Sequence, residues 1–193
     1  MGRRGTTARE PPGSVRIIGG EWRSRRLKIP RDTDVRPTPD RVRETVFNWL
    51  RDVIEGARCL DLFAGTGAFG FEALSRGAAE VWLVERDPLL VAALEEHAAL
   101  LGARPRVIRR DVHALLAEPP PKRFDVVFCD PPYDEPLAPL LERLADWLAP
   151  GGVIYGERHR REGLPEVPRL EWRKRGRAGD VVFGLAAAAP SEA

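Results

Sequence analysis

Long hydrophobic runs are missing from this sequence. No stretch of about 18 consecutive apolar residues occurs, so we expect no membrane-spanning helix. The first 14 residues, MGRRGTTAREPPGS, lack the apolar segment of a secretory signal, and we expect no such signal there. Together these absences favour a cytoplasmic protein that makes no contact with a membrane.

Cysteine and histidine are scarce. The two cysteines, Cys59 and Cys129, each lie inside an apolar, strand-like run, which favours two small buried side chains over a disulfide or a metal pair. The three histidines, His97, His113 and His159, have no Cys or His neighbour at metal-ligand spacing. We therefore expect no metal site.

The sequence has 193 residues, of which 43% are hydrophobic and 31% charged, and this suits one compact soluble domain. The net charge of +2 hides an uneven distribution. Lys and Arg outnumber Asp and Glu by 13 to 6 over residues 1–51 and by 8 to 4 over residues 157–177, whereas acids dominate by 17 to 10 over residues 52–156. Basic clusters suit a face that binds a polyanion, although solvated surface arginines explain them equally well.

One domain with a short extension at each end is predicted. Residues 1–14 are mostly Gly, Pro, Arg and Thr, which indicates a disordered N-terminal extension. The domain covers residues 15–186, and residues 187–193 are predicted to be a flexible tail.

Three parts follow one another within this domain. Two strand-like runs around a Gly-Gly pair predict a basic β-hairpin over residues 15–30. Helical spacing of apolar residues predicts a leading helix over residues 38–55, with Thr38 as its N-cap and Pro39 at its first helical position. Residues 57–186 form the core, where strand and helix patterns alternate.

The alternation of strands and helices in this core predicts an α/β fold. It indicates a mainly parallel sheet with helices on both faces. The expected parallel strands lie at residues 58–63, 81–85, 107–108, 124–129 and 153–155, and a closing antiparallel pair at 170–173 and 181–185.

A glycine-rich turn joins the first predicted strand of the core to a helix. Gly65, Gly67 and Gly70 would let a ligand approach the backbone where a Cβ atom would clash. Taken alone, the pattern also matches the fingerprint of dinucleotide-binding proteins. Asp61 precedes the glycines, and an acid at that position suits the ammonium group of S-adenosylmethionine.

Two further acids follow the next two predicted strands. Glu85 is placed to accept both ribose hydroxyl protons, a role that serves either S-adenosylmethionine or a dinucleotide. Asp111 is placed to bind an adenine amino group, but it also has the position of a helix N-cap, and both interpretations can hold together.

The most informative motif is Asp130-Pro131-Pro132-Tyr133, which ends the fourth predicted strand of the core. An aromatic amine is a poor nucleophile because its lone pair is delocalised into the ring. Asp130 and the carbonyl of Pro131 are suited to accept its N–H groups and hold it out of plane, while the two prolines stiffen the turn. Tyr133 offers a ring on which an extruded base can stack. The motif predicts methyl transfer to the amino group of a base.

With these motifs in place, the chain resembles the bacterial 16S rRNA guanine-N2 methyltransferases of the RsmD type over residues 15–185. The glycine loop and Asp-Pro-Pro-Tyr are shared with many amino-methyltransferases. More specific matches are the segments RIIGG at 16–20, LKIP at 27–30, RPT at 36–38, DRVRE at 40–44, FN at 47–48 and LDLFAGTGAFGFEALSRG at 60–77. The 14-residue N-terminal extension and the turn at residues 177–180 depart from the family pattern.

The resemblance implies a Rossmann-like class I methyltransferase fold, with a seven-stranded, mainly parallel sheet whose last strand is antiparallel, preceded by the β-hairpin. It implies S-adenosylmethionine as methyl donor, with S-adenosylhomocysteine as product, and guanine N2 of 16S rRNA as acceptor. The substrate would be that rRNA or the assembling small ribosomal subunit, and we expect a monomeric enzyme.

Site residues follow from the resemblance and from the charge of the hairpin. The expected cofactor-binding residues are Asp61, Phe63, Ala64, Gly65, Gly67, Glu85, Arg86, Asp111 and Val112. The expected catalytic residues are Asp130, Pro131, Pro132 and Tyr133. The expected substrate-binding residues are Arg36 and Thr38, with Arg23, Arg25 and Arg26 from the basic hairpin.

Three other functions remain to be weighed. A Rossmann dehydrogenase would explain the glycines and Glu85 but would leave residues 130–133 without a role. A non-catalytic RNA-binding module is weakened by the intact acidic positions. A DNA adenine-N6 or other amino-methyltransferase of the same fold would share the motifs, although the sequence has no evident DNA-recognition domain.

Overall fold

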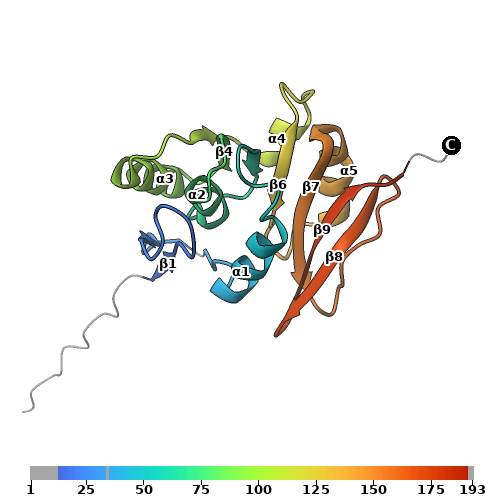
Figure 1. Cartoon of the computed structure of the whole chain (residues 1–193), viewed down its shortest axis with the longest axis horizontal. Helices are drawn as coiled ribbons and strands as arrows, with labels where there is room; N and C mark the ends of the chain where they lie inside the picture. The colour runs from blue at the N-terminus through green and yellow to red at the C-terminus, as the bar shows by residue number, and fades with distance from the viewer. Residues whose placement is uncertain (1–12, 34, 191–193) are drawn as a thin grey trace, which may run out of the picture.

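The structure is a computed structural model, and it describes residues 13–33 and 35–190 (Figure 1). A large twisted sheet runs through the molecule, with helices packed on both of its faces, and a small hairpin lies beside it. The predicted disordered extension at residues 1–14 lies almost wholly outside the described residues.

The large sheet has seven strands in the order β5-β4-β3-β6-β7-β9-β8. They are β3 (Arg58–Asp61), β4 (Glu80–Glu85), β5 (Arg106–Arg109), β6 (Phe124–Cys129), β7 (Leu148–His159), β8 (Leu170–Ala178) and β9 (Val181–Ala188). Strands β3 to β7 are parallel, and β9 lies antiparallel between β7 and β8. The predicted sheet with its last strand antiparallel is therefore confirmed.

Alternating side chains of the central strands supply two separate cores. Along β6, Val126 and Phe128 pack on one face of the sheet, and Val127 and Cys129 on the other, as the two-residue repeat of a strand requires. Helices α1 (Asp40–Trp49), α2 (Ala68–Ser75) and α3 (Pro88–Leu101) cover the first face. Helices α4 (Val112–Leu116) and α5 (Leu137–Leu144), followed by the short helix η1 (Ala145–Trp147), cover the second.

The leading helix is shorter than predicted. It spans Asp40–Trp49 instead of 38–55, and its N-cap is Pro39, so the assignment of Thr38 as N-cap is wrong. The following residues form turns in which the N–H of Ile54 still reaches the carbonyl of Leu50. Those turns keep the helical spacing of buried side chains without continuing the helix.

The closing strands are longer than predicted. Strands β8 and β9 extend well beyond 170–173 and 181–185, and β9 takes in the first two residues of the predicted tail at 187–193. The sequence signal was weak because β8 is an edge strand rich in exposed charged residues and β9 ends in alanines. Ala187 belongs to β9 and not to a tail because it pairs with Val153 of β7.

The predicted basic hairpin is present, with β1 (Ser14–Arg16) paired to β2 (Arg26–Lys28). Its connecting loop docks on α2, where the buried carboxylate of Glu72 accepts hydrogen bonds from the backbone N–H groups of Ile18 and Gly19 at 2.7 and 2.8 Å. Gly20 has a φ of +76°, and a Cβ there would lie 1.8 Å from the carbonyl oxygen of Ser75. The hairpin is thus fastened to the C-terminal end of α2.

Candidate active site

The glycine turn lies where the chain order of the sheet reverses, between β3 and β6. In open α/β sheets, ligands bind at this point, outside the carboxyl ends of the strands. Gly65 and Gly67 have φ angles of +53° and +82°, and Gly67 is the N-cap of α2. A Cβ on Gly67 would lie 2.5 Å from the ring of Phe71, so this turn requires glycine.

Asp61 ends β3 directly beneath this turn. Its carboxylate is buried, and Oδ2 accepts a hydrogen bond from the N–H of Gly70 at 3.1 Å. Burial raises the pKa of Asp61 to about 7, with a further contribution from the nearby charge of Glu85. A positively charged amino group beside this carboxylate would offset both its burial and the negative charge of Glu85. The Asp61 carboxylate therefore fits the amino-acid end of S-adenosylmethionine.

Glu85, at the end of β4, fixes the turn from the adjacent strand. Oε2 accepts a hydrogen bond from the N–H of Gly65 at 3.0 Å, and Oε1 accepts from Arg86 and Asp87 at 2.8 and 2.9 Å. Oε1 thus uses both of its lone pairs, whereas Oε2 accepts one hydrogen bond and keeps a second lone pair for a ribose hydroxyl.

Asp111 caps α4, because its Oδ1 accepts a hydrogen bond from the N–H of Ala114 at 3.1 Å. Its interpretation as a helix cap is therefore confirmed, and its adenine-binding role stays a prediction. Its other oxygen lies 3.8 Å from the guanidinium of Arg86, which is 76% exposed. Val112 is buried in α4.

The remaining two cofactor candidates flank the turn. Ala64 is buried, and its N–H donates to the carbonyl of Val84 at 3.0 Å. The side chain of Phe63 is half-buried and packs on the second core.

Asp130 directly follows β6, on the strand next to Asp61. The hydroxyl of Thr38 lies 3.1 Å from its Oδ2 and also 3.3 Å from Oε2 of Glu157, a buried side chain on β7. The hydroxyl of Tyr155 donates to the same oxygen of Glu157. Two carboxyl groups from neighbouring strands therefore meet around one threonine hydroxyl.

The burial and closeness of Asp130 and Glu157 shift the pKa values of both carboxyl groups. Burial, followed by the charge of Glu157, raises the pKa of Asp130 well above its usual range. Burial likewise raises the pKa of Glu157, against the hydrogen bonds from Tyr155 and Thr38, which lower it. The pair is thus suited to hold a proton between its two members.

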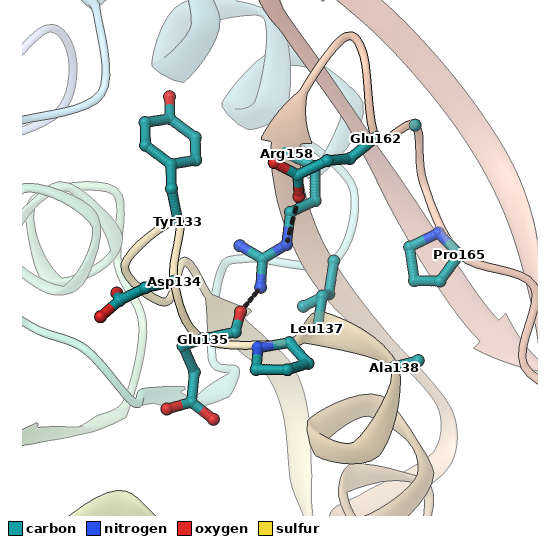
Figure 2. A pocket seen from close by; sticks show the side chains of 10 residues that line it. Tyr133, Asp134, Glu135, Leu137, Ala138, Arg158, Glu162 and Pro165 are labelled. Atoms are coloured by element: carbon teal, nitrogen blue, oxygen red, sulfur yellow. Dashed lines mark hydrogen bonds and ion pairs between the residues drawn. The ribbon is translucent and has the colours of Figure 1, made fainter.

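Arg158 fixes the turn that carries the four-residue motif. Its side chain is 3% exposed, and Nη1 donates to the carbonyl of Pro131 at 3.3 Å while Nη2 donates to the carbonyl of Glu135. Figure 2 shows the guanidinium between Glu135 and Glu162, whose carboxylate lies 3.9 Å from Nε. The carbonyl of Pro131 is therefore held in one direction by a buried cation.

Tyr133 is 54% exposed, and its ring meets the edge of His159 at a centroid distance of 6.3 Å. In Figure 2 its ring extends away from the guanidinium of Arg158. A cavity of about 340 Å³ lies on the side of Arg158 and is lined in part by Tyr133, Leu137 and Pro165. Pro132 is exposed in the same turn.

Sequence reasoning missed Tyr155, Glu157 and Arg158. The fifth strand was predicted to end at residue 155, whereas β7 continues to His159 and carries both charged residues in its buried part. The available signal was the pair Glu157-Arg158 directly after a run of apolar strand residues, since buried charges of that kind need partners.

The predicted substrate-binding residues do not lie together: some lie at the carboxyl ends of the strands and others toward the amino ends. Thr38 lies beside Asp130, and Arg36 is exposed two residues before it. The hairpin arginines lie elsewhere: Arg25 donates to the carbonyl of Leu100 at the end of α3, Arg26 donates to Ser14, and Arg23 is exposed in the loop that docks at Ser75. Because α2 and α3 run back from the carboxyl ends of the strands, the docking loop lies toward their amino ends, and its role in RNA binding stays a prediction.

Neither a metal-binding cluster nor a membrane-spanning helix occurs within residues 13–33 and 35–190. Within these ranges no group of three or more His, Cys, Asp or Glu side chains is arranged to hold a metal ion. In the same part of the chain, no helix has the length and apolar character needed to cross a membrane.

Solved structures share this fold. The structure of yhhF from Escherichia coli, a proposed methyltransferase by its name, has a TM-score of 0.82 and 42% identity, covering 91% of this chain and 98% of that one. A ribosomal protein L11 methylase from Lactobacillus delbrueckii, with a TM-score of 0.61 and 18% identity over 81% of this chain and 91% of that one, shares the fold alone. The fold is therefore that of a Rossmann-like methyltransferase.

Sequence comparison supplies the family. The chain is 43% identical over 179 residues to ribosomal RNA small subunit methyltransferase D of Escherichia coli K12, covering 90% of this chain and 89% of the relative. The family model described as Conserved hypothetical protein 95 matches residues 15–186. The chain belongs to this family, and its resemblance to the RsmD-type enzymes is confirmed.

Proposed function

We propose that this protein transfers a methyl group from S-adenosylmethionine to the exocyclic N2 of a guanine in 16S rRNA, in the cytoplasm and as a monomer. The observation that carries the proposal is the corner in which Thr38 and Arg158 fix the carboxyl group of Asp130 and the carbonyl of Pro131 beside the glycine turn. The small-subunit rRNA named for the Escherichia coli relative supports the choice of substrate.

The cofactor supplies a methyl group activated on a positively charged sulfur. Asp61 would hold its ammonium group, the backbone at Gly65 and Gly67 would allow its close approach, and Glu85 would accept the ribose hydroxyl protons. Asp111 keeps one oxygen free of the helix cap and would accept from the adenine amino group. These contacts would place the methyl group at the catalytic edge.

Asp130 and Pro131 would hold the base amine by its two N–H groups. Each acceptor is itself restrained, Asp130 by Thr38 and Pro131 by Arg158, so little reorganisation is needed when the base arrives. Turning the N–H bonds out of the ring plane restores lone-pair density on the nitrogen. Most of the rate acceleration would therefore come from positioning.

The amine becomes acidic when its nitrogen gains the methyl group, and one of its protons must leave. Asp130 is the nearest acceptor, and Glu157 lies behind it on the shared hydroxyl of Thr38. Burial raises the pKa of both groups, so each carboxylate, when ionised, accepts a proton more readily than an exposed one. Asp130 is the catalytic residue, and Glu157 acts through it as a positioning residue.

Tyr133 would provide the stacking surface for the extruded base. Its exposed ring lies three residues after Asp130, at the rim of the corner. Stacking of a base on an aromatic side chain contributes about 1–3 kcal/mol. This interaction would compensate part of the cost of removing the guanine from its own stack.

The proposal is tested by incubating the protein with methyl-labelled S-adenosylmethionine and, separately, naked 16S rRNA, small subunits, 23S rRNA and duplex DNA. Nucleosides are then separated by mass spectrometry. We expect N2-methylguanosine from 16S rRNA or small subunits. Methyladenine in DNA would support the DNA amino-methyltransferase instead, and no transfer to any substrate would support a non-catalytic RNA-binding module.

A further inference from the structure

The turn between β8 and β9 lies at the same edge of the sheet as the catalytic corner. β7 reaches this edge at His159, which pairs with Val181 at the start of β9. The N–H of Arg160 donates to the carbonyl of Asp180 at 2.7 Å, so the end of β7 and the turn are joined. In Figure 1 the tip of this hairpin lies beside α1.

Three arginines contact this turn and a fourth, Arg161, directly follows one of them; we call these residues the tip cluster: Arg41, Arg160, Arg161 and Arg177. Nη2 of Arg41, on α1, lies 3.4 Å from the position of a Cβ on Gly179. Nε of Arg177 donates to the carbonyl of the same glycine at 3.3 Å. The cluster therefore combines three separate segments of the chain in one place.

Most of this positive charge is uncompensated. Arg160 forms an ion pair with Asp180 at 2.9 Å. Arg41, Arg161 and Arg177 are exposed, and no carboxylate among the described residues lies within 4.0 Å of their guanidinium groups. Such groups remain free to bind phosphate through two parallel N–H donors.

The tip cluster is continuous with the catalytic corner. His159 meets the ring of Tyr133, and the N–H of Arg161 donates to Nδ1 of His159 at 3.2 Å. On the other side, α1 carries Arg41 and begins directly after Thr38, the residue bonded to Asp130. A strand of RNA that places a base on Tyr133 would therefore pass its neighbouring phosphates over these arginines.

We propose that the tip cluster binds the phosphates of the nucleotides that flank the methylated base. This inference rests on the proposed function, and it moves the main RNA contact away from the N-terminal hairpin. A base can be held out of its stack only if the backbone on either side is gripped, and phosphate contacts fix that position without reading sequence.

The test compares two triple variants of the full-length protein. One changes Arg41, Arg161 and Arg177 to glutamine; the matched control changes Arg23, Arg25 and Arg26 of the hairpin to glutamine. The dissociation constant for 16S rRNA is measured at several salt concentrations, and kcat and KM for the rRNA are measured with each variant. S-adenosylmethionine affinity and melting temperature report whether the fold and cofactor site are intact.

We expect the tip variant to bind rRNA about tenfold or more weakly, with the slope of log affinity against log salt reduced by about 2 to 3, since each lost phosphate contact contributes about 0.7–0.9. KM should rise more than kcat falls, with cofactor affinity unchanged. The inference is overturned if the tip variant keeps the wild-type slope, or if the hairpin variant loses more affinity. Methyl transfer by the wild-type protein is measured separately. If no methyl transfer occurs, the proposed function is wrong, and the binding data still show whether the tip cluster contacts RNA.

Discussion

Oγ1 of Thr38 lies 3.1 Å from Oδ2 of Asp130 and 3.3 Å from Oε2 of Glu157, so one hydroxyl serves two carboxyl groups on neighbouring strands. Thr38 belongs to the segment between the N-terminal hairpin and α1, outside the βα core. It joins that segment to the catalytic edge, and it separates two acids that would repel each other if both were ionised.

Thr38→Val should lower kcat about tenfold, because it leaves the two carboxyl groups without their shared donor and a hydrogen bond to a charged group contributes about 1.5–3 kcal/mol. Thr38→Ser is the matched control and should keep most of the activity. Single-turnover methyl transfer to 16S rRNA measures the effect. Equal rates for the valine and serine variants would show that the hydroxyl has no part in positioning Asp130.

Cofactor binding should depend on pH through Asp61, whose pKa of about 7 means that the carboxyl group is partly protonated in the free protein. An ammonium group needs the ionised form, so affinity should rise by up to about tenfold per pH unit below pH 7 and level off above it. Calorimetry in buffers of different ionisation enthalpy should detect proton release on binding at pH 6.5. Asp61→Asn should bind weakly at every pH, and an unchanged slope in that variant would assign the titration to another group.

The same pKa predicts an effect on folding stability. Because the folded state holds this proton more tightly than the unfolded chain, the stability from Asp61 is complete below about pH 4 and is lost as pH rises through about 7. Melting temperatures from pH 4 to 8 should therefore fall less steeply for Asp61→Asn than for the wild type.

Glu85→Ala should weaken S-adenosylmethionine binding about 10- to 100-fold, because it removes the proposed ribose acceptor and the hydrogen bond that Gly65 of the glycine turn donates to this side chain. Glu85→Gln retains one oxygen and should lose less. Isothermal titration measures both variants, with melting temperature as a check on the fold. An alanine variant with wild-type affinity would remove Glu85 from the cofactor site.

The sheet, the glycine turn and the strand-end position of the Asp-Pro-Pro-Tyr motif could be predicted because each depends on residues close together in the sequence. Strand patterns repeat every two residues, and a glycine turn or a double proline restricts the backbone where it stands. Asp111 was predictable for the same reason, since a helix cap depends on neighbours a few residues away.

Glu157 and Arg158 were not predictable in their roles because these depend on pairing between distant segments. Glu157 comes close to Asp130 only because Gly156 of β7 pairs with Cys129 of β6. Thr38 was misassigned as a cap for a related reason: a side chain 92 positions further along competes for its hydroxyl. Similarly, Arg23 and Arg25 of the hairpin have the right charge, but their loop docks at the C-terminal ends of α2 and α3, toward the opposite edge of the sheet.

Asp130→Asn tests the central claim most directly, since it keeps the size of the side chain and removes its charge. The measurement is single-turnover methyl transfer to 16S rRNA, made together with the dissociation constant of S-adenosylmethionine. We predict a rate lower by about 100-fold or more, because the amide oxygen of Asn can still accept an N–H but the side chain can no longer take up the departing proton, with cofactor affinity unchanged. Methyl transfer at the wild-type rate would contradict the account, because the corner around Asp130 would then have no part in the reaction.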